Sequence, residues 1–142
     1  MTEELKRAKN ILEDGGYTCV LLSGDKVYTD TARGVAPLLA FLDGSGYFSG
    51  FSAADKVVGN GAAYLYVLLD IKELYAKIVS EAARDTLKKY GIDLYYDTLT
   101  KNIINRAGDG ICPIEQTVAN AKSPQDALLR IREKLTSLTQ NK

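Results

Sequence analysis

The sequence predicts a three-layer α/β/α domain in which a mixed β-sheet carries helices on both faces. Three patterns support this fold class. Residues 17–30 read as two short strands joined by a Ser-Gly-Asp turn, which is typical of a β-hairpin. Residues 62–69 are almost wholly apolar, so we expect a helix that is buried on several sides. Residues 73–96 read as strand, helix and strand with short joints, which predicts a right-handed βαβ unit and a partly parallel sheet.

The first half of the chain is expected to begin with a helix over residues 1–14. Its apolar residues recur at helical spacing, and the Asp-Gly-Gly at 14–16 ends it. The hairpin strands follow at 17–22 and 26–30. A short helix over 35–42 has Pro37 in its first turn, where proline is tolerated. A third strand at 53–58 leads into the apolar helix.

In the second half, Ser80 is a good N-cap for a helix over residues 81–90. Gly91 stops that helix in the usual position after its last turn. We expect a strand at 92–96 and a short edge strand at 101–104. A further helix begins at Cys112-Pro113, and the last helix spans 123–138, with Ser at its N-cap and Pro at its first position.

Composition indicates an ordinary globular protein. The 142 residues are 46% hydrophobic and 25% charged, which predicts a single domain over 1–142 with a proper core. Lys+Arg and Asp+Glu balance at 18 each, so no nucleic-acid partner is expected. The longest apolar run is too short to cross a membrane. The charged N-terminus lacks a signal-like apolar region, which predicts a cytoplasmic location, and the two cysteines are expected to be free thiols.

The order of these elements resembles the cytidine deaminase fold. More narrowly, the chain is similar to a family of prokaryotic proteins with a variant of that fold, known as domain of unknown function 1893 or TM1506-like. The stretches that carry this resemblance are ADKVVG at 54–59 with the following Ala62-Ala63, SEA at 80–82, IINR at 103–106 and GICPIE at 110–115. The resemblance covers the chain from about Tyr17 onward.

The sequence departs from active deaminases at the positions that hold their zinc. Those enzymes need a His or Cys ligand with a nearby Glu on the buried helix and a Pro-Cys-x-x-Cys pair at the start of the next helix. Here the two positions fall in residues 59–63 and 80–83, which contain neither His nor Cys, and the chain has no histidine. Catalytic zinc needs three protein ligands, and Cys19 with Cys112 supply two. We therefore expect no metal, no cofactor and no zinc-dependent deamination.

A first candidate binding site follows the third predicted strand. Gly59, Asn60 and Gly61 lead into the buried helix, where unpaired backbone N–H groups and the helix dipole favour an anion. Glycine lets a ligand approach the backbone closely, and Lys56 is expected to pair with a phosphate or carboxylate. The alternative is a tight turn required by packing, with Asp55 and Lys56 as a solvated pair, because isolated glycine-rich turns are weak motifs.

A second candidate site is the polar loop that contains Arg106, Gly108 and Asp109, with Cys112 and Glu115 after it. The proline that follows Cys112 places this cysteine at a helix N-cap, where a thiolate is stabilised. Cys112 is therefore a candidate nucleophile, and Arg106 a candidate anion ligand. The alternative is a helix capped by a Cys112-x-x-Glu115 box under an ordinary loop. We favour this alternative because the chain has no histidine to act as the base.

Two further sets of residues receive simpler interpretations. Cys19 lies in an apolar stretch and is expected to be a small core residue. The aromatic side chains of Tyr47, Phe48 and Phe51 have no obvious place in a small core. They therefore predict a self-association surface.

Together with the resemblance, these residues favour a divergent deaminase-like domain that binds a small anionic or nucleotide-like ligand. Two alternatives stay open, namely an enzyme that uses Cys112 and a non-catalytic domain that associates with itself. The predicted ligand-binding residues are Lys56, Gly59, Asn60, Gly61, Arg106, Gly108, Asp109 and Cys112.

Overall fold

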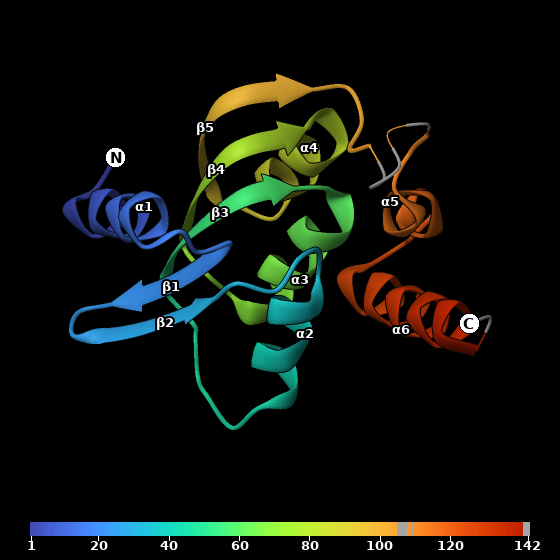
Figure 1. Ribbon diagram of the computed structural model, residues 1–142, viewed down its shortest axis with the longest axis horizontal. Coiled ribbons are helices and arrows are strands. Elements are labelled where there is room, and N and C mark those ends of the chain that lie inside the picture. Colours follow the sequence, from blue (N-terminus) through green and yellow to red (C-terminus); the bar gives the residue numbers. More distant parts are fainter. Residues whose placement is uncertain (105–107, 109, 141–142) are drawn as a thin grey trace.

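A computed structural model describes residues 1–104, 108 and 110–140 of the chain. Its centre is a five-stranded sheet in the order β2-β1-β3-β4-β5 (Figure 1). β1 (Cys19–Ser23) and β2 (Lys26–Asp30) form the predicted hairpin, and β1 also pairs antiparallel with β3 (Ser52–Val58). β4 (Glu73–Ser80) and β5 (Asp93–Thr100) continue the sheet in parallel with β3. The mixed sheet and its parallel half are therefore as predicted.

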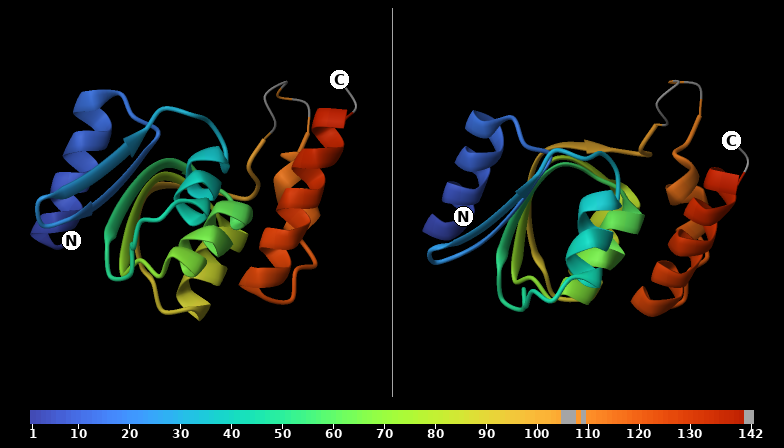
Figure 2. Two further views of the ribbon diagram at one scale, coloured as in Figure 1. Left: turned by 90° about the horizontal axis from the view of Figure 1, so that it is seen from below. Right: turned by 60° about the horizontal axis from the view of Figure 1, so that its bottom comes forward.

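Helices cover both faces of this sheet. The helices are α1 (Glu3–Gly15), α2 (Ala36–Asp43), α3 (Asn60–Leu69), α4 (Glu81–Lys89), α5 (Pro113–Val118) and α6 (Pro124–Gln140). α1 lies on one face against β1, β3 and β4, whereas α2, α3 and α4 lie on the other (Figure 2). α5 and α6 pack on the outer side of α3. The predicted three layers are present, and the α5–α6 pair adds a cover over the central helix.

Each face of the sheet has its own hydrophobic core. Under α1, the buried side chains of Leu5, Ala8 and Leu12 meet strand residues that include Val20 and Tyr75. The larger core lies between the sheet and α2, α3, α4 and α6. The apolar sequence of α3 is explained by this position, since α3 is in contact with the sheet, α2, α4, α5 and α6.

The start of α1 is tied to the sheet by a buried carboxylate. The Thr2 hydroxyl accepts a hydrogen bond from Leu5 N at 3.1 Å and donates to Glu73 Oε2 at 2.6 Å. The same Glu73 oxygen accepts the Ser52 hydroxyl at 2.5 Å. Glu73 is only 3% exposed, and these two donors supply the hydrogen bonds that a buried carboxylate requires.

The prediction of an aromatic self-association loop is wrong for two of its three residues. Phe48 and Phe51 are each 5% exposed. Their ring centroids lie 5.4 Å apart in an edge-to-face arrangement, and Tyr28 on β2 packs 5.1 Å from Phe48. Tyr47 alone of the three is exposed, at 80%. The loop folds back because the hairpin and α2 supply aromatic partners for these rings, which the sequence does not reveal.

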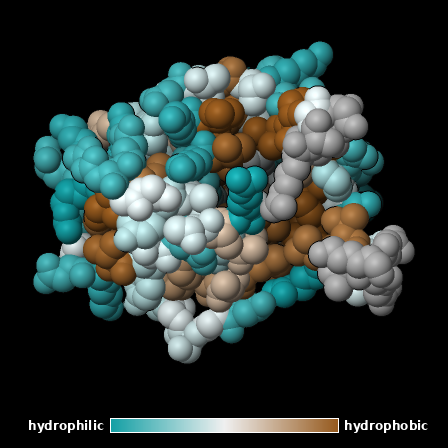
Figure 3. Space-filling view, in the orientation of Figure 1, coloured by the Kyte–Doolittle hydropathy of each residue, from teal (hydrophilic) through white to brown (hydrophobic). Residues whose placement is uncertain are grey.

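Two expectations about the C-terminal part of the sheet also need correction. β5 runs from Asp93 to Thr100, four residues beyond the predicted end. Residues 101–104 do not form an edge strand of the sheet, because Ile104 instead makes an isolated bridge with Ile111. In the space-filling view, hydrophobic residues reach the surface between the strands and the α5–α6 side (Figure 3). Among the described residues, no helix is long and apolar enough to cross a membrane.

Candidate functional site

The N-terminus of α3 binds a carboxylate of the same chain. Both side-chain oxygens of Glu115, which lies on α5, accept the backbone N–H of Asn60, with N···O distances of 2.8 and 2.7 Å. The Ser80 hydroxyl donates to Glu115 Oε1 at 3.3 Å. The sequence predicted a bound anionic ligand at this helix N-terminus, and in the structure the Glu115 carboxylate lies there.

Two backbone contacts lie next to the start of α5, the helix that carries Glu115. Ile104 forms a bridge with Ile111, and Cys112 N donates to Ile103 O at 2.9 Å. Cys112 is the N-cap of α5, as predicted, and the following proline occupies the first turn. The predicted capping box does not form, because the Cys112 side chain makes no cap hydrogen bond. The Glu115 carboxylate reaches across to α3 instead of bonding back to its own helix.

Two glycines make this close approach between α5 and α3 possible. A Cβ atom on Gly59 would lie 2.2 Å from Glu115 Oε1, and one on Gly61 would lie 2.6 Å from Ile114 Cγ2. A side chain at either position would force the Glu115 or the Ile114 side chain to move. The space beside these glycines is therefore filled by α5. A ligand would enter it only when the Glu115 carboxylate is displaced.

Ser80 and Asn60 link the start of α3 to α4 through side-chain hydrogen bonds. Ser80, the N-cap of α4, accepts Ala83 N at 3.1 Å while its hydroxyl donates to Glu115. Asn60 at the start of α3 accepts the Thr86 hydroxyl of α4 at 2.5 Å. Burial raises the pKa of Glu115, and the hydrogen bonds from Asn60, Ser80 and the Gly61 backbone act in the opposite direction.

Lys56 does not belong to this site, so that part of the prediction is wrong. Lys56 is exposed and lines a shallow pocket of about 250 Å³ with Leu12, Glu13, Tyr75 and Lys77. Leu12 and Tyr75 belong to the core under α1, so this pocket opens on the face of the sheet opposite to α3. Successive strand residues point to opposite faces, which separates Lys56 from the buried Asp55.

The second candidate site is only partly covered by the structure. Arg106 and Asp109 lie outside the described residues, and their predicted roles stay predictions. Gly108 is exposed and has a φ of 76°, a left-handed conformation that glycine adopts without strain. Cys112 is half-buried and is a free thiol. Within the described part of the chain, no hydrogen bond to its sulfur gives it a general base.

A buried polar cluster was missed by the reasoning from sequence. The hydroxyl of Tyr66 on α3 donates to Asp55 Oδ2 at 2.6 Å and lies 3.4 Å from Cys19 Sγ. Burial raises the pKa of Asp55 to about 7, although hydrogen bonds from Tyr66 and from the backbone of Val57 and Lys56 oppose this shift. Burial likewise raises the pKa of the Cys19 thiol. Asp55 is thus an interior carboxyl group and not half of a solvated pair.

The signal for this cluster was present in the alternation of the strand. Ala54 belongs to the core under α1, and the next residue, Asp55, bonds to α3 on the opposite face. An acid at an inward position of a buried strand requires a hydrogen-bond donor. A tyrosine on the adjacent apolar helix was the available partner, but pairing the two requires knowledge of which helix covers that face.

Metal binding finds no preorganised site in the described part of the chain. No group of three or more His, Cys, Asp or Glu residues there is close enough to hold an ion. The polar groups at the start of α3 are therefore hydrogen-bond donors to Glu115, namely the Asn60 N–H and the Ser80 hydroxyl.

Comparison with known proteins decides the family. A model of the family described as TM1506, domain of unknown function (DUF1893), matches residues 7–135. The chain belongs to the DUF1893 family. A crystal structure of a DUF1893 family protein (TM1506) from Thermotoga maritima superposes on this DUF1893 chain with a TM-score of 0.84 and 24% sequence identity, covering 96% of this chain and 92% of the other. That likeness shows the fold. No curated protein matches the chain.

Proposed function

We propose that this DUF1893 chain is a binding domain for a small anion, which it holds at the N-terminus of α3 when the Glu115 carboxylate is displaced. The observation that carries the proposal is the pair of short contacts between Glu115 and Asn60 N, at 2.7 and 2.8 Å. A position that already accommodates a carboxylate has the donors and the field that a carboxylate or phosphate ligand needs.

The chemistry of the site favours one oxyanion with at least two acceptor oxygens. The Asn60 N–H and the Ser80 hydroxyl both converge on Glu115, and the α3 dipole adds a partial positive charge. Glu115 acts as a tethered competitor, so the affinity for a free anion is reduced by the fraction of time for which the carboxylate occupies the site. The finer proposal is a nucleotide-like ligand with its phosphate at this position.

The nucleotide part of the proposal comes from the resemblance to the cytidine deaminase fold and is a fold-level analogy. Its support is the neighbouring position of two helix N-termini, since Glu115 accepts hydrogen bonds both from Asn60 N at the start of α3 and from Ser80, the N-cap of α4. The resemblance places the zinc ligands of deaminases at these two helix starts, in residues 59–63 and 80–83. This chain has no His or Cys at either, so the proposed ligand is bound without zinc.

The test is to remove the tethered carboxylate and supply a free one. Glu115→Ala should lower the free energy of unfolding by about 1–3 kcal/mol, since it leaves the donors at Asn60 and Ser80 unpaired. Acetate, inorganic phosphate and nucleoside monophosphates should then raise the melting temperature of this variant more than that of the wild type. Thermal-shift titrations at constant ionic strength measure this difference.

Glu133→Ala is the matched control. Glu133 is an exposed acid on α6, so this substitution removes the same charge at a position away from the site. If Glu115→Ala responds to these anions no more than Glu133→Ala, Glu115 is only an internal helix cap and the proposal fails. Arg106→Ala tests the loop residue in the same assay. We expect weaker anion binding and an unchanged melting temperature without ligand.

A further inference from the structure

A pocket lies between α4 and β5, apart from the site at Glu115. Its volume is about 320 Å³, at the lower end of the range of small-molecule sites. It runs along the start of β5, whereas Glu115 is bonded to Ser80, which pairs with Thr100 at the end of that strand. The residues that line the pocket are Arg84, Lys88, Gly91, Ile92, Asp93, Leu94 and Tyr96.

Two positive charges of the pocket come from one side of α4. Lys88 lies four residues after Arg84, a spacing that places two side chains next to each other on a helix and that slightly destabilises the helix when their charges are alike. In the described part of the chain, no acid pairs with the Lys88 ammonium, and Asp85 alone pairs with Arg84, through Nε at 3.2 Å. The Asp85 side chain is 70% exposed. The terminal nitrogens of Arg84 and the Lys88 ammonium are therefore open to another partner.

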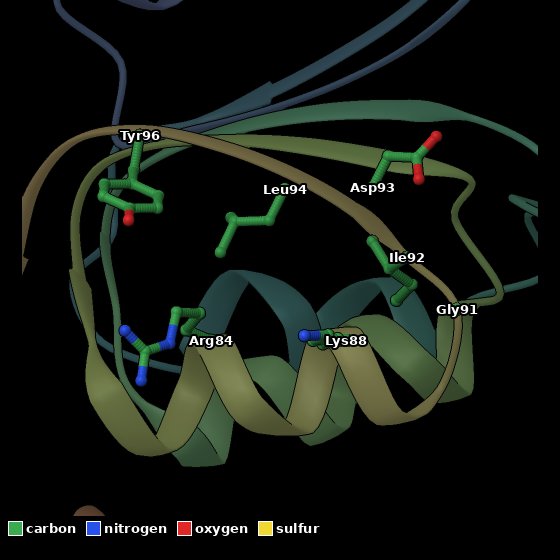
Figure 4. Close-up of a pocket in the computed structure, with 7 residues that line it drawn as sticks. All are labelled: Arg84, Lys88, Gly91, Ile92, Asp93, Leu94 and Tyr96. Atoms are coloured by element: carbon green, nitrogen blue, oxygen red, sulfur yellow. The ribbon is translucent and has the colours of Figure 1, made fainter.

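The acids of β5 point away from these two cations. Asp93 contributes to the lining, but its carboxylate points away from α4 (Figure 4). Asp97 Oδ2 accepts the Tyr75 hydroxyl at 2.7 Å, and Tyr75 belongs to the core under α1, on the other face of the sheet. The complementary ligand for the pocket is therefore an anion.

The wall opposite the cations is apolar and aromatic. Leu94 and Tyr96 point from β5 toward α4 (Figure 4), because side chains two residues apart on a strand share a face. Tyr96 is 42% exposed. In the part of the chain that the structure describes, no hydrogen bond involves its hydroxyl and no other ring packs on it. This wall fits the flat, apolar part of a ligand, which an aromatic ring contacts over a large area.

The pocket on the other face of the sheet lacks this combination. It is lined by Lys56 and Lys77, but also by the acid Glu13. The hydroxyl of its tyrosine, Tyr75, is already bonded to Asp97. Of these two pockets, the one between α4 and β5 is therefore better suited to an anion with a ring.

We propose that the pocket between α4 and β5 binds a small molecule in which a phosphate or a carboxylate is attached to a flat ring. Arg84 donates to the anionic group through its two terminal nitrogens, Lys88 adds a second positive charge, and the ring lies against Tyr96. This site is separate from the one at α3, and the proposal does not rest on anion binding there.

The experiment is a titration of ¹⁵N-labelled protein with phenyl phosphate and with benzoate, followed by the chemical shifts of the backbone amides. We expect saturable shifts within residues 88–96. The two ligands distinguish a phosphate from a carboxylate as the anionic group. Inorganic phosphate and phenol each carry one half of the proposed ligand, and each should bind about tenfold or more weakly than phenyl phosphate.

Substitutions test the contacts one at a time. Arg84→Gln and Lys88→Gln remove a charge but keep a good helix former, and each should weaken phenyl phosphate binding about tenfold or more. Tyr96→Leu should weaken the binding of phenyl phosphate but not that of inorganic phosphate. Lys89→Gln is the matched control, because Lys89 lies over the Tyr90 ring and outside the pocket, and it should leave binding unchanged. Thermal melts show whether each variant is folded.

Three results would overturn the proposal. Neither phenyl phosphate nor benzoate shifts residues 88–96, or Lys89→Gln weakens binding as much as Lys88→Gln does, or inorganic phosphate binds as tightly as phenyl phosphate. Glu115→Ala should leave the affinity of this pocket unchanged. A failure here and a failure of the proposed site at α3 are therefore observed at different residues.

Discussion

Asp55 is a carboxyl group in the interior, next to two other titratable groups. Tyr66 donates to it, and Cys19 lies on the far side of the same tyrosine hydroxyl. Burial raises the pKa of Asp55 from 3.8 to about 7. The folded protein therefore binds this proton more tightly than the unfolded chain does, and the protonated form of Asp55 favours folding.

This shift predicts a direction for the pH dependence of stability. The contribution of Asp55 is fully present below about pH 4 and is lost as the pH rises toward 7, because the folded state binds more protons in this interval. Asp55→Asn keeps an acceptor for Tyr66 without the charge. It should be more stable than the wild type above pH 7, by at most about 4 kcal/mol.

Urea denaturation of both proteins at pH 5 and pH 8 measures this difference. Asp25→Asn is the control, since Asp25 is exposed in the hairpin turn. An advantage of Asp55→Asn that is the same at both pH values would show that the carboxyl group does not titrate between them.

At the scale of elements, Ser80 connects the start of α4 to α5. It caps α4 by accepting Ala83 N and donates to Glu115. Ser80→Ala should cost about 1 kcal/mol for the lost cap and about 1 kcal/mol for the lost bond to Glu115. Ser123→Ala is a matched control, because Ser123 accepts Asp126 N at the start of α6 at 3.0 Å and should cost only the cap.

A double-mutant cycle of Ser80→Ala with Glu115→Ala separates these two contributions. We expect a coupling of about 0.5 kcal/mol or more between the two substitutions in denaturant unfolding. Additive effects would mean that the 3.3 Å contact between Ser80 and Glu115 contributes nothing measurable to stability.

Local patterns predicted most elements of the fold. The strand–turn–strand pattern predicted the β1–β2 hairpin, and Ser80 with Gly91 predicted the limits of α4, which spans Glu81–Lys89. The extension of β5 to Thr100 was not predicted, because residues 97–100 are polar or exposed and carry no clear alternation toward a core. An edge strand is stabilised by pairing with its neighbouring strand, and the sequence of the segment alone does not reveal that pairing.

The predicted ligand site at the start of α3 stays a prediction, and the structure shows a carboxylate of the same chain there. The small residues before α3 indicated an anion at that helix N-terminus, and Gly59 and Gly61 do lie against one. This carboxylate belongs to Glu115, which is 55 residues from Asn60 along the chain. The residues next to Glu115 in the sequence instead favoured a local capping box with Cys112. Contacts of this kind depend on how α5 packs against α3, which hydrophobic periodicity does not specify.

At the scale of the whole molecule, the chain keeps the framework of a strand–helix–strand domain while its polar groups are bonded to one another. Asp55 is bonded to Tyr66, Glu73 to Thr2 and Ser52, and Glu115 to the N-termini of two helices. In the described part of the chain, no buried side-chain nitrogen or oxygen lacks a hydrogen-bond partner. Each of these interior carboxyl groups therefore has hydrogen-bond donors that offset the cost of its burial.

The distribution of metal-ligating residues predicts that the protein folds and remains stable without zinc. The chain has no histidine, and its cysteines are Cys19 and Cys112. Cys19 is buried beside Tyr66, and Cys112 begins α5. A zinc site requires three or four ligands in one place, and metal binding would stabilise the folded state if such a site existed.

We therefore expect the purified protein to contain less than stoichiometric zinc, to show the same melting temperature with and without a chelator, and to leave cytidine unchanged. Elemental analysis after dialysis against a chelator, with thermal melts on the same samples, measures this. One zinc per chain that survives chelation, or a melting temperature that falls when the chelator is added, would contradict the prediction.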